Sequence, residues 1–432
     1  MKNLIYTLIL ILSSCWLLNS QVPIPAKDQD QPIIIMNATA HLGNGRIIDN
    51  SAIAFEDGKL TIVADATTVR IDMSKYDVID AAGKHVYPGF ILPNTQLGLV
   101  EVNAVRATND QTEEGAINPN VRSIIAYNTD SENIPTMRFN GILLAEPTPL
   151  GGTISGTSSV VELEGWNWED ASHSVDIAMH MNWPGKTSRS FDFSTFTISE
   201  SPNKNYDKDV AALKKHFEDA KSYGEQTERV TNLKLEKMQG LFDGSITLMI
   251  HASGPKEIIE GVNLAKEQGV ERIAVVAGTA AIYVASFLSD NEIGVIIPPV
   301  HSLPGRPDQD IDLPYRLPHL LNEAGVKVGL SHSGMLANAR NLPFYAGTAA
   351  AYGMSKEDAL KTITSNTAEI LGISDRVGTL ETGKDATLFI SEGDALDIRS
   401  SILSDAFISG KRVTLDNKQQ ALYKRYSEKY GH

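Results

Sequence analysis

The chain has 432 residues, of which 42% are hydrophobic, and a formal net charge of -15 at pH 7. This length exceeds that of one small domain and suits a barrel of about 250–300 residues joined to a second unit. The acidic balance argues against nucleic acid or an anionic membrane surface as a binding partner.

The first twenty residues have the pattern of a secretory signal peptide. Lys2 gives a positive start, residues 4–12 form an apolar run, and Ser20 offers a cleavage site. Polar residues interrupt the run before it reaches the length of about 20 residues that a membrane span needs. We therefore expect an exported, periplasmic protein, with residues 1–20 as signal peptide and residues 21–32 as a polar linker.

The only cysteine, Cys15, lies in the segment LSSC, which resembles a bacterial lipoprotein signal. Two outcomes stay open: ordinary cleavage of the signal, which we favour, or attachment of a lipid anchor at Cys15. If Cys15 is removed or lipidated, the folded protein has no free thiol. Disulfide bonds and thiol catalysis are then excluded.

Short β-like runs separated by the turn signals GNG and EDGK extend to residue 87. From Phe90 onward, apolar strand-like runs such as SITLMIHA and RIAVVAG alternate with helical stretches, as in a parallel α/β sheet. Because no glycine-rich phosphate turn follows any strand, the spacing predicts a (β/α)8 TIM-like barrel over residues 88–375 rather than an open sheet. Its last helix has Ser355 as expected N-cap and Gly372 as expected C′ residue.

After residue 376 the sequence returns to β character, and residues 419–432 form a charged amphipathic helix. The two β segments, residues 33–87 and 376–418, flank the barrel in the chain. We therefore expect them to pair into one small β-sandwich domain that is built from both ends of the chain.

Four histidines lie near the ends of expected strands, and the C-terminal ends of barrel strands meet at one rim. They are His180, His251, His301 and His332. One interpretation brings them together around a metal in a rearranged site. The alternative is that each is a structural histidine, packed inside a strand or placed in a loop.

Arg106 and Asn109 follow the first expected barrel strand, in the segment NAVRATND. Two roles stay open for them. They can contact a substrate at the rim, or they can order the loop through local hydrogen bonds.

Four stretches carry a resemblance to a known family. They are VYPGFILPNTQLG, MIHASGPKEIIEGVNLAKEQG, AGVKVGLSHSGMLANARNLPFYAGTAAAYGMSKEDALKTITSNTAEILGI and RVGTLETGKDATLFI. The sequence resembles the amidohydrolase superfamily, in its imidazolonepropionase-like branch, over nearly the whole chain after residue 32. The resemblance implies a distorted (β/α)8 barrel joined to a β-sandwich from both chain ends.

The resemblance also implies one or two divalent metals at the C-terminal ends of the barrel strands. Most of the ligand positions are substituted here: the HxH pair after strand 1 falls on Asn94 and Gln96, and the strand 6 histidine falls on Ala277. The strand 5 histidine is kept as His251, and the strand 8 aspartate falls on or beside His332. No strand 4 ligand can be placed.

Carboxamide oxygens bind zinc weakly, and zinc needs three or four ligands. With these substitutions, the resemblance implies either no tightly bound cofactor or one divalent metal such as zinc in a rearranged site. His251 would then be a metal ligand and catalytic group, and His332 a ligand or a base that works near neutral pH. Asn94 and Gln96 would face the substrate.

Two functions stay open after this reading. The first is an exported amidohydrolase-type hydrolase with a degenerate or rearranged metal site, acting on a C–N bond of a small cyclic amide or peptide-like substrate. The second is a catalytically inactive barrel that binds a small-molecule ligand or pairs with an active homologous amidohydrolase. Assembly into a homo-oligomer is a further expectation.

Overall fold

The computed structural model describes residues 24–192, 194–305 and 308–431. The expected signal peptide and Cys15 lie outside the described residues. Within this part of the chain, every helix is too short or too polar to cross a membrane.

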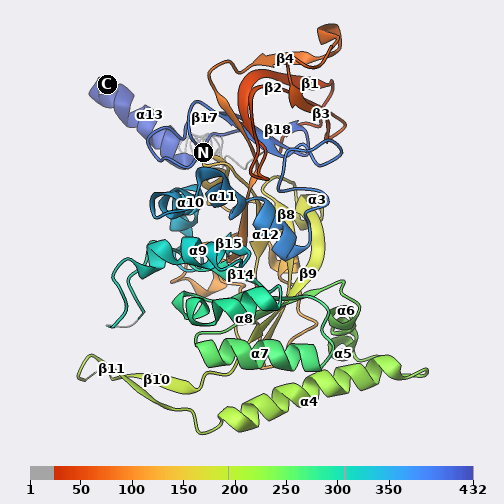
Figure 1. Ribbon diagram of the computed structural model, residues 1–432, viewed down its shortest axis with the longest axis vertical. Coiled ribbons are helices and arrows are strands. Elements are labelled where there is room, and N and C mark those ends of the chain that lie inside the picture. Colours follow the sequence, from red (N-terminus) through yellow and green to blue (C-terminus); the bar gives the residue numbers. More distant parts are fainter. Residues whose placement is uncertain (1–23, 193, 306–307, 432) are drawn as a thin grey trace, which may run out of the picture.

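Segments from both ends of the chain form one eight-stranded sheet, drawn at the top of Figure 1. The strand order is β18-β17-β16-β5-β1-β2-β3, with β4 beside β1. The two ends meet where β5 pairs antiparallel with β16. The strands are β1 (Ile33–His41), β2 (Ile47–Glu56), β3 (Lys59–Asp65), β4 (Asp77–Asp80), β5 (His85–Pro88), β16 (Leu388–Ser391), β17 (Leu403–Ile408) and β18 (Lys411–Arg412). We call this the composite sheet; all its strands are connected by pairing, and both chain ends contribute to it.

A second eight-stranded sheet forms the barrel, in the order β15-β14-β13-β12-β9-β8-β7-β6. Strand β15 approaches β6, so the barrel is nearly closed. The strands are β6 (Phe90–Thr95), β7 (Ile142–Pro147), β8 (Ile154–Glu162), β9 (Ser172–Asn182), β12 (Thr247–His251), β13 (Ile273–Val276), β14 (Gly294–Ile297) and β15 (Val328–Leu330). The predicted α/β barrel is thus present in outline.

One barrel strand departs from the expected parallel arrangement. Strand β8 runs antiparallel to both β7 and β9. Only residues 148–153 connect β7 to β8, and a connection this short can join antiparallel strands, whereas parallel strands need a longer crossover. The segment between β7 and β8 therefore sets the direction of β8.

Helices surround the barrel and link its strands. They are α2 (Ile134–Arg138), α3 (Trp168–Ala171), α4 (Tyr206–Glu225), α5 (Leu233–Lys237), α6 (Gln239–Phe242), α7 (Pro255–Glu267), α8 (Ala285–Asp290), α9 (Leu313–Glu323), α10 (Leu342–Ala351), α11 (Lys356–Lys361), α12 (Ser365–Leu371) and α13 (Lys418–Tyr430). Short 3-10 helices are η1 (Met73–Lys75), η2 (Arg106–Thr108), η3 (Ser123–Ala126), η4 (Thr279–Val284) and η5 (Leu336–Asn341).

The helix expected after Ser355 is split into α11 and α12. Its ends are as predicted: Ser355 accepts a hydrogen bond from the Asp358 N–H, and Gly372 is left-handed. The break has a structural reason. The Leu330 N–H donates to the carbonyl of Thr362 at 3.0 Å, and the Ile91 N–H donates to that of Ile363 at 2.9 Å. The break therefore lies between β15 and β6, where it helps to close the barrel.

The segment between β9 and β12 forms an extension that the sequence did not lead us to expect. The hairpin of β10 (Thr187–Asp192) and β11 (Thr197–Pro202) is followed by the long helix α4. Figure 1 shows both at the end of the molecule opposite the composite sheet, while α13 projects from the body beside that sheet.

Alternate residues of the barrel strands belong to two separate apolar clusters. Leu144, Ala178 and Met249 cluster with residues of the other strands: Ile91, Val160 and Ile296. Their chain neighbours, among them Leu143 and Ile250, pack instead with the surrounding helices. Because successive side chains of a strand point to opposite faces, the first cluster lines the barrel interior.

Candidate functional site

A layer of polar side chains lies next to the apolar interior, at the C-terminal rim of the barrel. Glu146 follows the interior residue Leu144 by two positions, and His251 follows Met249 in the same way, so each points inward like its predecessor. His180 likewise follows the interior residue of its own strand. On the antiparallel strand β8, Ser158 comes two positions before the interior residue and so reaches the same rim.

These four residues form a continuous hydrogen-bonded chain, which we call the rim network. The Ser158 hydroxyl donates to Glu146 Oε1 at 2.6 Å. His180 Nε2 lies 2.8 Å from Ser158 Oγ and 3.3 Å from Glu146 Oε1. His180 Nδ1 lies 2.9 Å from His251 Nε2. Glu146 Oε2 accepts a further hydrogen bond from the backbone N–H of Asn94 at 2.9 Å.

The bonding pattern assigns the protons of the two imidazoles. Since the Ser158 hydroxyl donates to Glu146, its oxygen accepts from His180 Nε2–H. A neutral His180 then accepts at Nδ1 from His251 Nε2–H, which leaves Nδ1 of His251 without a proton. Burial, and then the neighbouring His180, lower the pKa of His251 to about 3, so this imidazole is neutral at pH 7.

Solvent reaches the rim network through His251. Glu146 and Ser158 are fully buried, and His180 is 1% exposed. His251 at the end of β12 is partly exposed. His251 is therefore the member of the rim network that solvent contacts.

Asn94 lies in strand β6 and Gln96 directly follows it, beside the rim network. Both are buried, with exposed fractions of 5% and 6%. Asn94 is left-handed, with φ 47°, a conformation that asparagine tolerates better than most residues. Oδ1 of Asn94 and Nε2 of Gln96 have no hydrogen-bond partner among the described residues. Leaving such a buried polar atom unpaired costs about 1–3 kcal/mol.

The other two predicted histidines lie around Tyr345 of α10 and outside the rim network. His332 Nδ1 lies 2.8 Å from the Tyr345 hydroxyl, and His332 Nε2 lies 3.0 Å from the carbonyl of Met335. His301 meets the Tyr345 ring edge-on and bonds Thr348 Oγ1 at 2.7 Å. Burial lowers the pKa of both histidines and raises that of Tyr345 to about 12.

The residues at the rim, as placed, do not fit the metal that the family resemblance implies. Within the described residues, no three His, Cys, Asp or Glu side chains are grouped so that they could hold an ion, and zinc needs three or four ligands. Nitrogens of His180 and His251 bond each other, and both nitrogens of His332 have partners. Ala277, at the expected strand 6 position, offers no ligand.

Arg106 and Asn109 lie in the loop that follows β6. Arg106 begins η2 and is exposed, and Asn109 is partly buried. The Asn109 N–H donates to the Arg106 carbonyl at 3.1 Å, and Thr108 Oγ1 bonds the carbonyls of Val102 and Val105. These local bonds order the loop.

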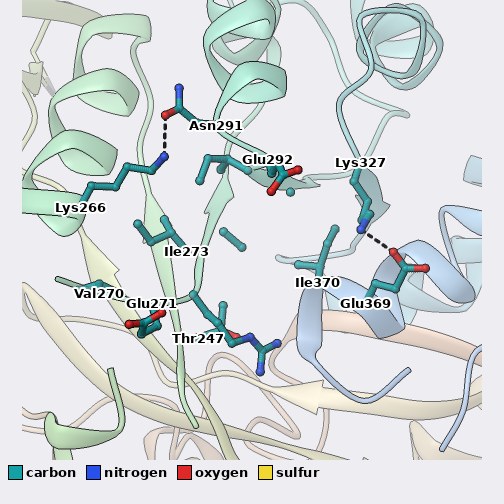
Figure 2. Close-up of a pocket in the computed structure, with 14 residues that line it drawn as sticks. Thr247, Lys266, Val270, Glu271, Ile273, Asn291, Glu292, Lys327, Glu369 and Ile370 are labelled. Atoms are coloured by element: carbon teal, nitrogen blue, oxygen red, sulfur yellow. Dashed lines mark hydrogen bonds and ion pairs between the residues drawn. The ribbon is translucent and has the colours of Figure 1, made fainter. Parts of the chain in front are cut away.

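Two cavities lie away from the rim network. One of about 310 Å³ opens where β12, β13 and β14 begin, at the opposite end of the barrel. Figure 2 shows its charged lining, in which Lys327 pairs with Glu369 and Lys266 bonds Asn291. The other, of about 610 Å³, lies between α10 and residues 394–398, with His301 in its lining.

Comparison with known proteins shows that this chain is similar to amidohydrolases. The model of the "Amidohydrolase family" matches residues 314–416. An amidohydrolase from Thermotoga maritima MSB8 has 22% sequence identity and a TM-score of 0.76, over 88% of this chain and 99% of that one. The predicted resemblance to the amidohydrolase superfamily is confirmed.

Other amidohydrolase-like structures share the fold at lower similarity. A prolidase solved with N-methylphosphonate-L-proline has 14% identity and a TM-score of 0.55, over 89% of this chain and 99% of that one. An adenosine deaminase from Xanthomonas campestris with bound zinc has 14% identity and a TM-score of 0.52, over 92% of this chain and 97% of that one. A search of curated proteins finds no match. The fold shared with these structures thus covers most of the chain.

The sequence reading missed two members of the rim network in this amidohydrolase-like barrel. Glu146 is the one charged residue of the apolar strand β7 and lies near its C-terminal end. The rule that polar residues at the C-terminal ends of barrel strands meet at one rim would therefore also have identified Glu146. Ser158 carries no such signal, because it lies inside β8 and reaches the rim only because that strand is reversed.

Proposed function

We propose that the protein is a hydrolase that cleaves a carbon–nitrogen bond at the C-terminal rim of its barrel. The observation that carries this proposal is the hydrogen-bonded chain from the partly exposed His251 to the buried Glu146. The amidohydrolase family match, and similar structures named as a prolidase and an adenosine deaminase, support the reaction class.

The rim network supplies the proton transfer that such a hydrolysis needs. A water oxygen bonds to the carbonyl carbon while His251 Nδ1 takes the water proton. His251 passes its own Nε2 proton to His180, and His180 passes its Nε2 proton to Glu146, directly or through Ser158. The chain runs back when the C–N bond breaks, and the leaving nitrogen takes the proton.

This relay removes the difficulty that the low pKa of His251 raises. A histidine with a pKa of about 3 is a weak base when it must hold an added proton. In the relay, His251 gains one proton as it loses another, so it carries no net charge. The carboxylate of Glu146 is the group whose charge changes.

Hydrolysis of a panel of cyclic amides and dipeptides tests the proposal. We expect wild-type turnover, and a loss of about 10²-fold or more in kcat/KM for Glu146→Gln and for His251→Ala. His216→Gln on the surface of α4 is the matched histidine control and should keep full activity. Equal rates in wild type and both network variants would refute the assignment. Circular dichroism checks that each variant is folded.

Metal content is measured on the same preparation, made without a tag. We expect less than about a tenth of an equivalent of zinc, since the placed side chains do not form a three-ligand site. A full equivalent would show that the rim side chains rearrange around an ion.

The described residues contain no three-residue metal site, and this favours a second function. In it the protein is an inactive barrel that binds a small molecule or pairs with an active homologous amidohydrolase. In this case the wild type hydrolyses no member of the panel, with or without added zinc. Co-purification with an active homologue then supports pairing, and light scattering reports a homo-oligomer.

A further inference from the structure

We infer that Asn94 and Gln96 form a binding site for a neutral amide-type group, in which Gln96 donates to the ligand carbonyl and Asn94 accepts from the ligand N–H. The inference deepens the proposed function, on which it rests, by naming the residues that recognise the substrate and the group that they read.

Gln96 is held through its side chain and Asn94 through its backbone, and each side chain keeps one polar atom without a partner among the described residues. The Gly334 N–H donates to Gln96 Oε1 at 3.4 Å, so this oxygen is engaged and Nε2 is the unused donor. The backbone N–H of Asn94 is held by Glu146, and Asn94 Oδ1 is the unused acceptor. Each residue is more than nine-tenths buried, so bulk water does not readily satisfy these two atoms.

The two free atoms select the chemistry of the ligand. A carboxylate offers only acceptors, so it leaves Asn94 Oδ1 unpaired and brings a negative charge near Glu146. An ammonium group offers only donors and leaves Gln96 Nε2 unpaired. An uncharged amide offers a carbonyl oxygen and an N–H, and so pairs with both.

The location ties this recognition to the rim network. Asn94 and Gln96 are two positions apart at the end of β6, and Glu146 bonds the Asn94 backbone directly. An amide held here lies at the rim that His251 opens to solvent. Residues at positions where the resemblance expects metal ligands would thus bind the substrate itself.

A pair of ring compounds of nearly equal shape tests the inference. In 2-pyrrolidinone the ring contains an N–H, and in γ-butyrolactone an oxygen replaces it. A site that reads an N–H rejects the analogue that lacks it, so we expect the wild type to bind the lactam about 10-fold or more tighter, by ligand-observed NMR titration. Equal affinity for both rings, or no lactam binding, overturns the inference.

Variants of Asn94 and Gln96 test whether these side chains cause the preference for the lactam over the lactone. Gln96→Met keeps the length of the side chain but removes its donor, and Asn94→Gly removes the acceptor at a left-handed position that glycine adopts readily. Both should weaken lactam binding, and Asn94→Gly should also abolish the preference over the lactone. The matched control Gln420→Met, on the exposed face of α13, should change neither. A preference that survives in Asn94→Gly overturns the inference.

Binding and turnover are read separately. A wild type that prefers the lactam but hydrolyses no amide overturns the proposed function and leaves the recognition site standing. A wild type that hydrolyses amides without any lactam preference overturns the recognition site alone.

Discussion

At the scale of single residues, His251 makes the stability of the protein depend on pH. Its pKa is about 3 in the folded chain and about 6.5 in an unfolded one. As the pH falls below about 6.5, the unfolded chain binds the proton first, so the free energy of unfolding decreases down to about pH 3.

His251→Gln tests this contribution, because glutamine can still donate a hydrogen bond to His180 but does not titrate. Between pH 7 and pH 4 the wild type should lose about 3 kcal/mol relative to the variant, measured by urea unfolding at several pH values. A constant difference between the two proteins across this range would contradict the low pKa.

The placement of single side chains was only partly predictable. The rule that strand ends meet at one rim led us to expect His180 and His251 near each other, and their nitrogens lie 2.9 Å apart. It did not separate His251 from His332, which also follows a strand but turns toward α10. The direction of a side chain after the last strand residue depends on the loop, and no sequence pattern gave that geometry.

At the scale of elements, the end of α12 depends on close contact as well as on backbone conformation. Gly372 is left-handed, with φ 74°, and a Cβ atom there would overlap the guanidinium group of Arg272. Gly431 ends α13 with nearly the same conformation, φ 73°, but a Cβ there would meet no atom within 4 Å.

Alanine at these two glycines separates the two effects. Gly431→Ala should cost less than about 1 kcal/mol, because it strains only the backbone at the end of an exposed helix. Gly372→Ala must in addition displace the flexible end of the Arg272 side chain and should cost about 1–2 kcal/mol, measured by urea unfolding. Equal effects of the two substitutions would show that Arg272 moves aside at no cost.

Most of the larger elements could be predicted, and the exceptions have physical reasons. Strands such as β12 and β13 have apolar runs with clear boundaries, and the caps of the helix after Ser355 were right. The reversal of β8 and the split between α11 and α12 could not be predicted. The reversal follows from a connection whose shortness shows only once the ends of β7 and β8 are known. The split depends on contacts between segments far apart in sequence, such as the bond from Ile91 to Ile363.

At the scale of the whole molecule, a charged cluster joins the barrel to the composite sheet. Asp385, just before β16, bonds Lys59 of β3 and lies 3.1 Å from His173 Nε2 of β9. Arg376 pairs with the same carboxylate at 2.9 Å and donates to the His173 carbonyl. Although burial alone would raise the pKa of Asp385, these bonds and the charges of Arg376 and Lys59 lower it to about 2.

This cluster should make the molecule sensitive to acid. The folded pKa lies below the ordinary value, so the ionised carboxylate stabilises the protein above about pH 4, and this stability is lost as the pH falls toward 2. Lys59 and Arg376 are 49% and 40% exposed, so solvent screening limits the effect to about 1–2 kcal/mol. Asp385→Asn should lower the free energy of unfolding at pH 7 by that amount.

The comparison across pH values identifies the cause. Between pH 4 and pH 2.5 the stability of the wild type should approach that of Asp385→Asn. Protonation then removes the negative charge of Asp385 in the wild type, and the substitution has already removed it in the variant. Asp397→Asn is the matched control: the pKa of Asp397 is also lowered to about 2, but its side chain is 37% exposed and pairs with Arg399, two residues away. Such a local bond can persist in the unfolded chain and should leave stability unchanged. An equal loss in both variants would mean that Asp385 does not hold the two parts of the molecule together.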